Sequence, residues 1–456
     1  MINVTTHYDR RKAAKGSEGH MMVSIKASEK GQKRTPVCIS LVIDTSGSMA
    51  ERCDQTSDHH MRNIHFKSKL DVVKDTAKKI IENLTENDQI SIVGFANRAT
   101  LVLSRCNINK SGLGALLTTI DNLVANGGTN MSAGILEAKT QIDPNFKGVR
   151  RIMVLTDGQV NDGVVDQNQL VGICKTSEIT YSTFGFGRDA NQDLLKAISK
   201  ECSGNFYYIP GGNDVGIVFA RELGGITSCV AQNIKLEITP GKDNELLGLL
   251  NDFKSEMKDG KMFIYADDIF AGETKHILVK MKVNSDKVAK VHLSFDHLKK
   301  SKRITDDFDL KVDIVSEEKA DKQPILIVQE QVALLTVAKA QLEAVQCAAS
   351  GHYVKAQNII RGASVMLQDC ANQGSSFCST AVDLVNGAVE HFSATNYSVD
   401  YGNTVSNSAG NSLRHRGGSV NFSGQDGAGA SCGLDTMFET NSHKLMVKKF
   451  DKKKKA

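Results

Sequence analysis

Apolar runs alternate with segments of helical periodicity between residues 36 and 225. Residues 36–43 and 151–156 are almost entirely apolar, as a strand buried on both faces requires. Between them, apolar residues from Leu70 to Leu84 recur at helical spacing. Strands that alternate with helices in this way build a parallel sheet with helices on its faces. We therefore predict an α/β fold with a doubly wound, mostly parallel sheet over residues 36–225.

Polar and apolar residues alternate with period two in the segments that flank this region. Residues 230–238, 273–283 and 288–295 show the alternation, which is typical of an antiparallel sheet with one wet face. They predict an additional β-sandwich domain over residues 226–318. Residues 1–35 hold two more short strands, which we expect to pair with this sandwich.

Helical periodicity returns in residues 319–395. Two apolar stripes are separated by a break at Ser350-Gly351-His352, which predicts a C-terminal helical hairpin, and residues 382–392 fit a third helix. Either contact with another protein or packing against the sandwich accounts for such a hairpin. Residues 396–456 are rich in Asn, Ser and Gly and end in lysines, so we expect a disordered tail.

Charge and composition narrow the classes of partner. The chain has 456 residues and a net charge of +4, but seven Lys and one Asp in residues 444–456 contribute +6 of it, which leaves about −2 for the remainder. Aromatic residues make up 5% of the chain and there is no Trp. We therefore expect no nucleic-acid binding from the folded body. The Lys-rich end is either a solvated tail, a contact for anionic membranes or nucleic acid, or a nuclear address.

The sequence lacks the marks of a secreted or membrane-spanning protein. Its ten cysteines include no C-x-x-C pair, and several lie inside apolar runs, as buried thiols do. The first residues do not combine a basic with an apolar region, and no apolar stretch approaches eighteen residues. We therefore expect a reduced, cytoplasmic protein with no membrane span.

A carboxylate and two hydroxyls follow the first buried strand at every second position. They are Asp44, Ser46 and Ser48. Hard cations such as Mg²⁺ prefer oxygen ligands, and Mg²⁺ keeps several waters and few carboxylates, whereas zinc prefers nitrogen and sulfur. Asp, Ser and Gly are also common in ordinary turns, so this motif alone is weak evidence.

Two later segments strengthen the case for a cation site. Residues 126–130 form a Gly-rich turn that carries Thr129, and Asp157 follows the second buried strand. Ligands of a doubly wound fold gather at the carboxyl ends of its strands. We therefore expect Asp44, Thr129 and Asp157 to meet at one edge of the sheet.

These positions resemble the metal-ion-dependent adhesion site of von Willebrand factor type A domains. The family pattern is D-x-S-x-S, then a Thr, then an Asp, and it is matched by Asp44, Ser46, Ser48, Thr129 and Asp157. Residues 185–189 and 204–209 are most similar to a subgroup with YfbK-like bacterial proteins, inter-alpha-trypsin inhibitor heavy chains and plant RING-type ubiquitin ligases. The resemblance covers about residues 36–225 and continues more weakly to about 395.

The resemblance implies metal-dependent protein–protein interaction. In the family, the two Ser and the Thr contact a Mg²⁺, Mn²⁺ or Ca²⁺ ion directly or through water, and the two Asp lie partly behind waters. A position left open on the ion accepts a carboxylate from a partner protein. Residues beside the ligands are then expected to contact that partner: Gly47, Met49, Gly128, Asn130 and Gly158.

Other functions remain open from the sequence. A metal-dependent hydrolase needs a general base, and the only nearby histidines are His59, His60 and His65, in a polar insertion over residues 50–69. That insertion is a second metal site, a specificity loop or a solvated loop. No P-loop, G-x-S-x-G or H-E-x-x-H motif is present, so we predict no enzyme. The plant relatives suggest a substrate-recruiting component of a ubiquitin-ligase-like assembly, and a metal site that stays empty in a structural protein is a further alternative.

Overall fold

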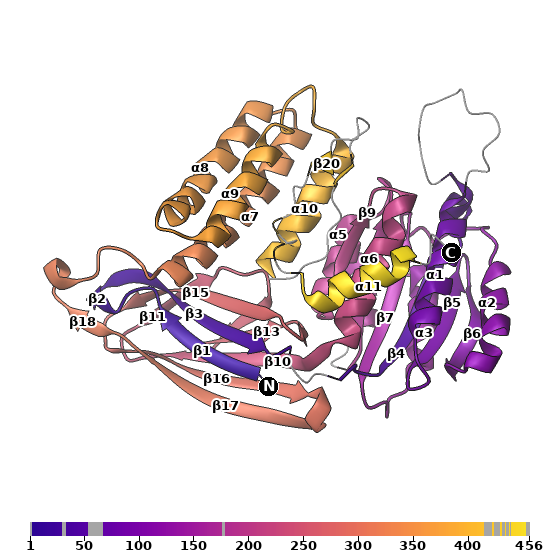
Figure 1. Cartoon of the computed structure of the whole chain (residues 1–456), viewed down its shortest axis with the longest axis horizontal. Coiled ribbons are helices and arrows are strands. Elements are labelled where there is room, and N and C mark those ends of the chain that lie inside the picture. Colours follow the sequence, from indigo (N-terminus) through magenta and orange to yellow (C-terminus); the bar gives the residue numbers. More distant parts are fainter. Residues whose placement is uncertain are drawn as a thin grey trace. The chain divides into compact units, whose positions relative to one another are not determined.

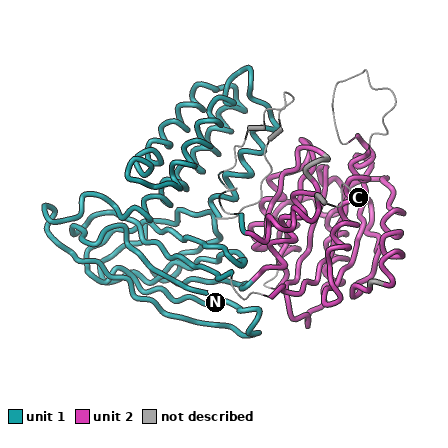
Figure 2. Tube along the Cα trace, viewed as in Figure 1, with its two compact units in different colours: residues 1–32, 230–440 teal, residues 33–229, 441–456 magenta. Residues whose placement is uncertain are grey.

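The chain forms two compact units, each made of two separate segments. The computed structural model describes residues 2–29, 33–52, 67–175, 178–414 and 439–452, with a few positions between 422 and 437. Residues 1–32 and 230–440 belong to unit 1, and residues 33–229 and 441–456 belong to unit 2 (Figure 2).

Unit 2 is built on a six-stranded sheet in the order β6-β5-β4-β7-β8-β9 (Figure 1). All neighbouring strands are parallel except β5 and β6. Every residue of β4 is buried, as its continuous apolar sequence predicts. The strands are β4 (Val37–Asp44), β5 (Gln89–Phe95), β6 (Ala99–Asn107), β7 (Val149–Thr156), β8 (Thr180–Phe186) and β9 (Phe206–Ile209).

Helices cover both faces of this sheet, which confirms the predicted doubly wound α/β fold. Side chains of α3, α4 and α5 share one hydrophobic cluster with one face of the strands. On the opposite face, Phe219 of α6 stacks on Phe184 of β8, with ring centroids 4.1 Å apart, and α1 packs against α6. The helices are α1 (Lys69–Asn83), α2 (Leu113–Asp121), α3 (Met131–Gln141), α4 (Gln167–Cys174), α5 (Gln192–Glu201), α6 (Gly212–Thr227) and α11 (Asn441–Lys452).

Unit 1 contains two antiparallel sheets that enclose a common core. The first has the order β1-β3-β15-β11, so strands from the unit's two separate segments lie side by side. This is the pairing that the sequence predicts for residues 1–35. Its strands are β1 (Ile2–Tyr8), β3 (Ser17–Ala27), β15 (Thr274–Val283) and β11 (Glu245–Leu249).

The second sheet of unit 1 has the order β12-β13-β10-β16-β17, with β14 also paired to β10. Val23 of β3 and Leu236 of β10 belong to one hydrophobic cluster, so the inner faces of the two sheets form a sandwich. The strands are β10 (Cys229–Pro240), β12 (Lys254–Lys258), β13 (Lys261–Ala266), β14 (Ile269–Phe270), β16 (Lys287–His297) and β17 (Lys302–Lys311). Two short pairs form separate sheets: β2 (Lys12–Ala14) with β18 (Asp313–Val315), and β19 (Phe422–Ser423) with β20 (Gly429–Ala430).

Helices α7 to α10 complete the described part of unit 1. They are α7 (Leu326–Ala349), α8 (Tyr353–Asn372), α9 (Ser376–Val389) and α10 (Val399–Leu413). The turn between α7 and α8 contains Gly351 at φ +79°, which explains the predicted break there. Among the described residues, α7 is the one helix whose length and hydropathy would allow it to cross a bilayer, and half of that window is buried inside the protein.

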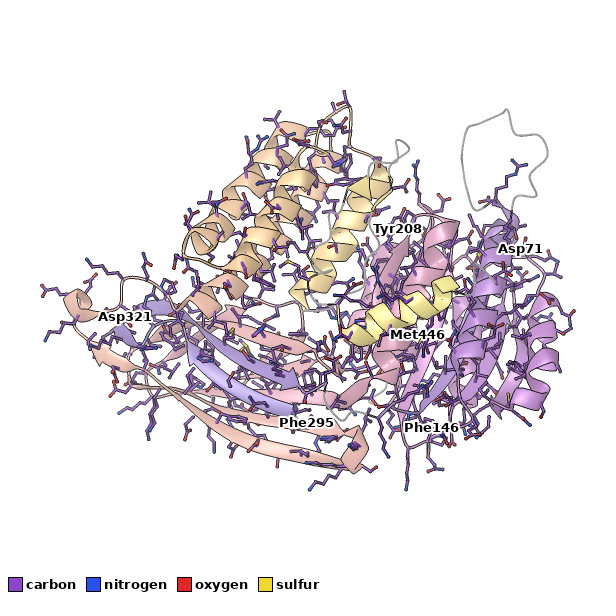
Figure 3. All side chains as sticks on the ribbon, viewed as in Figure 1. Asp71, Phe146, Tyr208, Phe295, Asp321 and Met446 are labelled. Carbon is purple, nitrogen blue, oxygen red and sulfur yellow. The ribbon has the colours of Figure 1, made fainter. Side chains whose placement is uncertain are left out.

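The prediction of a disordered tail from residue 396 is wrong for two segments. Tyr401, Val405 and Ala409 are buried at intervals of four residues and form an apolar stripe along α10. Near the end of the chain, Met446 (labelled in Figure 3) and Phe450 are buried on α11, which packs on α6. Asn, Ser, Gly and Lys dominate the composition around these stripes, which is why the sequence predicts disorder there. Residues 53–66, which carry the three predicted loop histidines, lie outside the described residues.

Candidate metal centre

The predicted ligand motif lies at the carboxyl ends of two neighbouring strands. β4 and β7 are parallel and pair Ile43 with Leu155, so Asp44 and Asp157 follow adjacent strand ends. Both carboxylates are almost fully buried, at 0% and 1% exposed. Two acidic groups are therefore buried at one edge of the sheet. The cost of removing them from water must be offset by hydrogen bonds or positive charge.

The turn after β4 directs its polar side chains back toward these carboxylates. Ser46 N donates to Asp44 Oδ1 at 2.8 Å, and the hydroxyls of Ser46 and Ser48 lie 3.1 Å apart. Ser48 Oγ donates to Asp157 Oδ1 at 2.8 Å. The Thr156 hydroxyl donates to the second oxygen of Asp44. One connected group of oxygens therefore joins the two strand ends.

Thr129 joins this group from the Gly-rich turn. Gly127 has φ +84°, a conformation that favours glycine, and its carbonyl accepts from Gly47 N at 3.0 Å. Thr129 N donates to Asn161 Oδ1 at 2.8 Å. A Cβ on Gly158 would lie 3.6 Å from Ser48 Oγ and 3.8 Å from Thr129 Oγ1, so both hydroxyls lie beside this glycine. The structure thus brings all five predicted ligand residues together.

The residues expected to contact a partner do not all lie on the surface. Gly47 is exposed, and Gly128 and Gly158 are half-buried. Met49 is fully buried, so the prediction that it contacts a partner is wrong: the short 3₁₀ turn η1 (Gly47–Ala50) points this side chain inward. Asn130 Oδ1 accepts from Ala133 N at 3.0 Å, so this residue caps α3.

Burial affects the ionisation of Asp44. Desolvation is the largest influence and raises the pKa of its carboxyl, and the neighbouring Asp157 carboxylate raises it further. Hydrogen bonds from Ser46 and Thr156 partly oppose the shift. A cation at the site would oppose this shift, because it favours the charged form of the Asp44 carboxyl.

A lysine that sequence reasoning missed already supplies one positive charge here. Lys69 Nζ lies 2.7 Å from Asp157 Oδ2 and 2.7 Å from Glu51 Oε2. Burial is the largest influence on the pKa of Lys69 and lowers it, but the bonds and charges of Asp157 and Glu51 outweigh burial and raise it. A signal was present in the sequence: Lys69 is in helical phase with Val73 and Ile80 on the buried side of α1.

The donor set fits a hard cation that takes oxygen ligands. Three hydroxyls and two carboxylates converge, which is the ligand type of Mg²⁺, Mn²⁺ and Ca²⁺. No three His, Cys, Asp or Glu side chains gather as a metal cluster within the part of the chain that the structure describes. Zinc coordination by nitrogen and sulfur therefore finds no support among those residues.

Comparison with known proteins identifies the family of the domain that carries this centre. The five oxygen-bearing side chains lie within residues 39–219, the stretch matched by the family model of the von Willebrand factor type A domain. That stretch is a von Willebrand factor type A domain. Domains of this family generally mediate protein–protein interaction and often bind a divalent metal ion at the adhesion site.

Two similar proteins among the curated sequences are longer than this chain. The chain is 29% identical to YfbK of Escherichia coli (strain K12) over 48% of its own length, and 24% identical to the E3 ubiquitin-protein ligase WAV3 of Arabidopsis thaliana over 56%. These matches span 36% and 32% of the two relatives, about a third of each.

The likeness to a solved structure extends beyond the A domain. It is a von Willebrand factor type A protein from Catenulispora acidiphila, with a TM-score of 0.67 and 16% identity. The match covers 89% of this chain and 96% of that protein. The combination of an A domain with a sandwich and helices is therefore a fold that occurs elsewhere.

Proposed function

We propose that the A domain binds a partner protein through a divalent cation at this centre. Ser46, Ser48 and Thr129 would supply hydroxyl ligands, and Asp44 and Asp157 would supply negative charge directly or through water. A carboxylate of the partner would complete the coordination. The observation that carries the proposal is the convergence of these five side chains, from three separate segments, at one edge of the sheet.

The charge of the centre suits an acidic ligand. Two carboxylates would roughly neutralise a divalent ion, and Lys69 adds a further positive charge beside them. Glu51 balances the charge of Lys69, so the attraction for a partner carboxylate would come from its direct contact with the ion. Two unit charges 4 Å apart attract by about 4 kcal/mol at an effective dielectric constant of 20, so one such contact is a substantial part of a binding energy.

The neighbouring residues support a pre-formed site. Thr156 fixes Asp44, Asn161 fixes the backbone of Thr129, and Gly127 anchors the turn after β4. A binding centre whose ligands are held in place loses little conformational entropy when the ion and partner arrive. Such an arrangement suits a binding module.

The likeness to WAV3 favours one narrower version of this role. The domain would then recruit a substrate to a ubiquitin-ligase-like assembly, and ligase subunits would be captured together with the acidic partner. The cytoplasmic location expected from the sequence also stays a prediction.

The test combines metal binding with partner capture. We expect the wild-type protein to bind Mn²⁺ in calorimetry and to capture the same host proteins with Mg²⁺ present but not with EDTA. Asp44→Ala and Asp157→Ala should lose both properties while circular dichroism shows a folded protein. Asp121→Ala, which removes an exposed carboxylate of α2, is the matched control and should behave as wild type. Partners that remain bound to both site variants would overturn the proposal.

A further inference from the structure

Lys69 lies between a predicted metal ligand and a residue outside the ligand set. Its ammonium donates to Asp157 Oδ2 and to Glu51 Oε2, each at 2.7 Å. Asp157 is buried, whereas the side chain of Glu51 is 61% exposed. One partner is therefore fixed in the centre and the other stands at its solvent side.

The backbone around Lys69 holds its side chain in this position. Ser68 caps α1 in a capping box with Asp71, which is labelled in Figure 3. Lys69 N donates to Glu51 O at 2.9 Å, and a β-bridge joins Ser68 to Arg52. With its side chain 10% exposed, the ammonium is a fixed part of the centre.

A fixed ammonium and a divalent ion compete for the same negative charge. The other oxygen of Asp157 accepts from Ser48, so both oxygens of this carboxylate are used by the protein itself. An arriving ion must weaken the contact between Lys69 and Asp157, and it then meets a like charge at short range in a partly desolvated site. Both effects reduce the affinity for the ion.

We propose that Lys69 is a built-in counter-cation that sets the metal affinity of this centre. Without metal, its ammonium neutralises Asp157 and keeps the buried carboxylate paired. When the ion binds, Lys69 retains Glu51 as its partner, so Glu51 holds the displaced charge. This inference rests on the proposed function, because it assumes a divalent ion at the five ligand residues.

The first experiment is a titration with MnCl₂ by calorimetry, without any partner. Lys69→Met should bind Mn²⁺ at least tenfold more tightly than wild type, because the competing charge is gone. Lys69→Arg keeps the charge and should stay within about threefold of wild type. Lys67→Met removes a neighbouring exposed charge that pairs with Asp75, and it should leave the affinity unchanged.

The melting temperature gives a second readout. Lys69→Met leaves Asp157 without its cation, so its melting temperature without metal should fall below that of wild type, and saturating Mn²⁺ should restore it. If this variant unfolds without metal at room temperature, its affinity is read from melting curves over a series of Mn²⁺ concentrations. If the melting temperature of Lys69→Met equals that of wild type both without and with metal, Lys69 does not stabilise the Asp157 carboxylate as a counter-charge.

Glu51→Gln tests where the displaced ammonium goes. Without Glu51, Lys69 should stay on Asp157, and the affinity for Mn²⁺ should fall. In the Lys69→Met background Glu51→Gln should change the affinity for Mn²⁺ much less, because the ammonium that Glu51 binds is absent. If Glu51→Gln changes the affinity for Mn²⁺ equally in wild type and in Lys69→Met, Glu51 acts only through its own charge. That result would overturn its role as the partner of the displaced Lys69 ammonium.

The outcomes separate this inference from the proposed function. Wild type that binds Mn²⁺ no more weakly than Lys69→Met would overturn the inference and leave the metal site intact. Binding by Lys69→Met alone would support the inference and overturn the proposed function, because the wild-type centre would then be blocked by its own lysine. Absence of binding in both proteins would overturn both.

Discussion

Two buried ion pairs in the A domain each join a basic to an acidic side chain, but their surroundings differ. Arg151 of β7 lies 3.6 Å from Glu222 of α6, with both side chains at most 1% exposed. Lys69 and Asp157 are also largely buried, but they stand beside a group of hydroxyls at the end of the sheet.

The carboxylate of the first pair is enclosed in a network of hydrogen bonds. Glu222 accepts from Asn205 and Tyr207, each at 2.7 Å, and from the Ser182 hydroxyl. Every carboxylate oxygen thus has protein donors, and nothing in the arrangement invites a ligand. In the second pair the carboxylate is shared by a lysine and a serine at an edge where strand ends meet. The comparison shows that burial of a charge alone does not indicate function, whereas the convergence of hydroxyl and carboxylate oxygens from separate segments does.

The largest expected effect comes from breaking the enclosed pair. Arg151→Met leaves Glu222 buried without its cation, which typically costs about 3–5 kcal/mol. Urea unfolding followed by circular dichroism measures the loss. A loss below about 1 kcal/mol would show that the hydrogen bonds alone stabilise this carboxylate.

Acid should weaken the same pair. Burial raises the pKa of Glu222, but Arg151 and three hydrogen bonds outweigh burial, so the pKa is lowered from its ordinary 4.5. The stability that this group contributes is therefore present above the unfolded pKa and is lost as pH falls through the folded pKa.

Comparison with Glu222→Gln isolates this contribution. The difference in unfolding free energy between wild type and the variant should be constant near neutral pH and shrink below pH 4.5 by up to about 1.4 kcal/mol for each pH unit. Urea titrations at several pH values measure it. A difference that stays constant down to acid unfolding would contradict the lowered pKa.

A smaller effect is expected at the hydroxyl that supports Asp44. Thr156→Val removes the donor to Asp44 and the acceptor for Gly158 N, and an unsatisfied buried group costs about 1–3 kcal/mol. Unfolding without metal should show this loss, and Mn²⁺ affinity should also change. Thr156→Ser keeps the hydroxyl and serves as the control, so a loss of the same size in both variants would point to packing instead.

The smallest effect should come from an exposed pair in the same domain. Lys78 pairs with Asp121 at the surface, and such pairs typically contribute about 0–1 kcal/mol. Lys78→Met should therefore leave both stability and Mn²⁺ affinity close to wild type. A shift in metal affinity here would mean that long-range charge, rather than contact, explains the effect of Lys69.

Much of the A domain could be predicted because its signals are local. Asp44, Ser46 and Ser48 form one short motif, and Asp157 directly follows a recognisable apolar strand. The role of Lys69 could not be read in the same way, because its partner Asp157 is 88 residues away and is reached only in the folded sheet. Sequence spacing alone does not reveal such a contact.

The errors have related physical causes. Met49 follows the ligand motif directly, but the direction of its side chain depends on the 3₁₀ turn and not on its position in the sequence. The stripe of α10 is spaced correctly for a helix, yet it is diluted by residues that favour disorder. The composition of this segment predicts disorder and its apolar periodicity predicts a helix, and the structure agrees with the periodicity.

The long-range pairing of β3 with β15 has a consequence during protein synthesis. Ser24 of β3 bonds to His276 of β15, 252 residues later in the chain. At about 5–20 residues per second, a ribosome needs roughly 13–50 s to make that partner. Throughout this time the apolar residues Met21, Met22 and Val23 have no completed sheet in which to be buried. Strands β4 to β9 of the A domain are made before β15, so β3 stays without this neighbour while they are synthesised, and chaperone demand should be concentrated on the N-terminal segment.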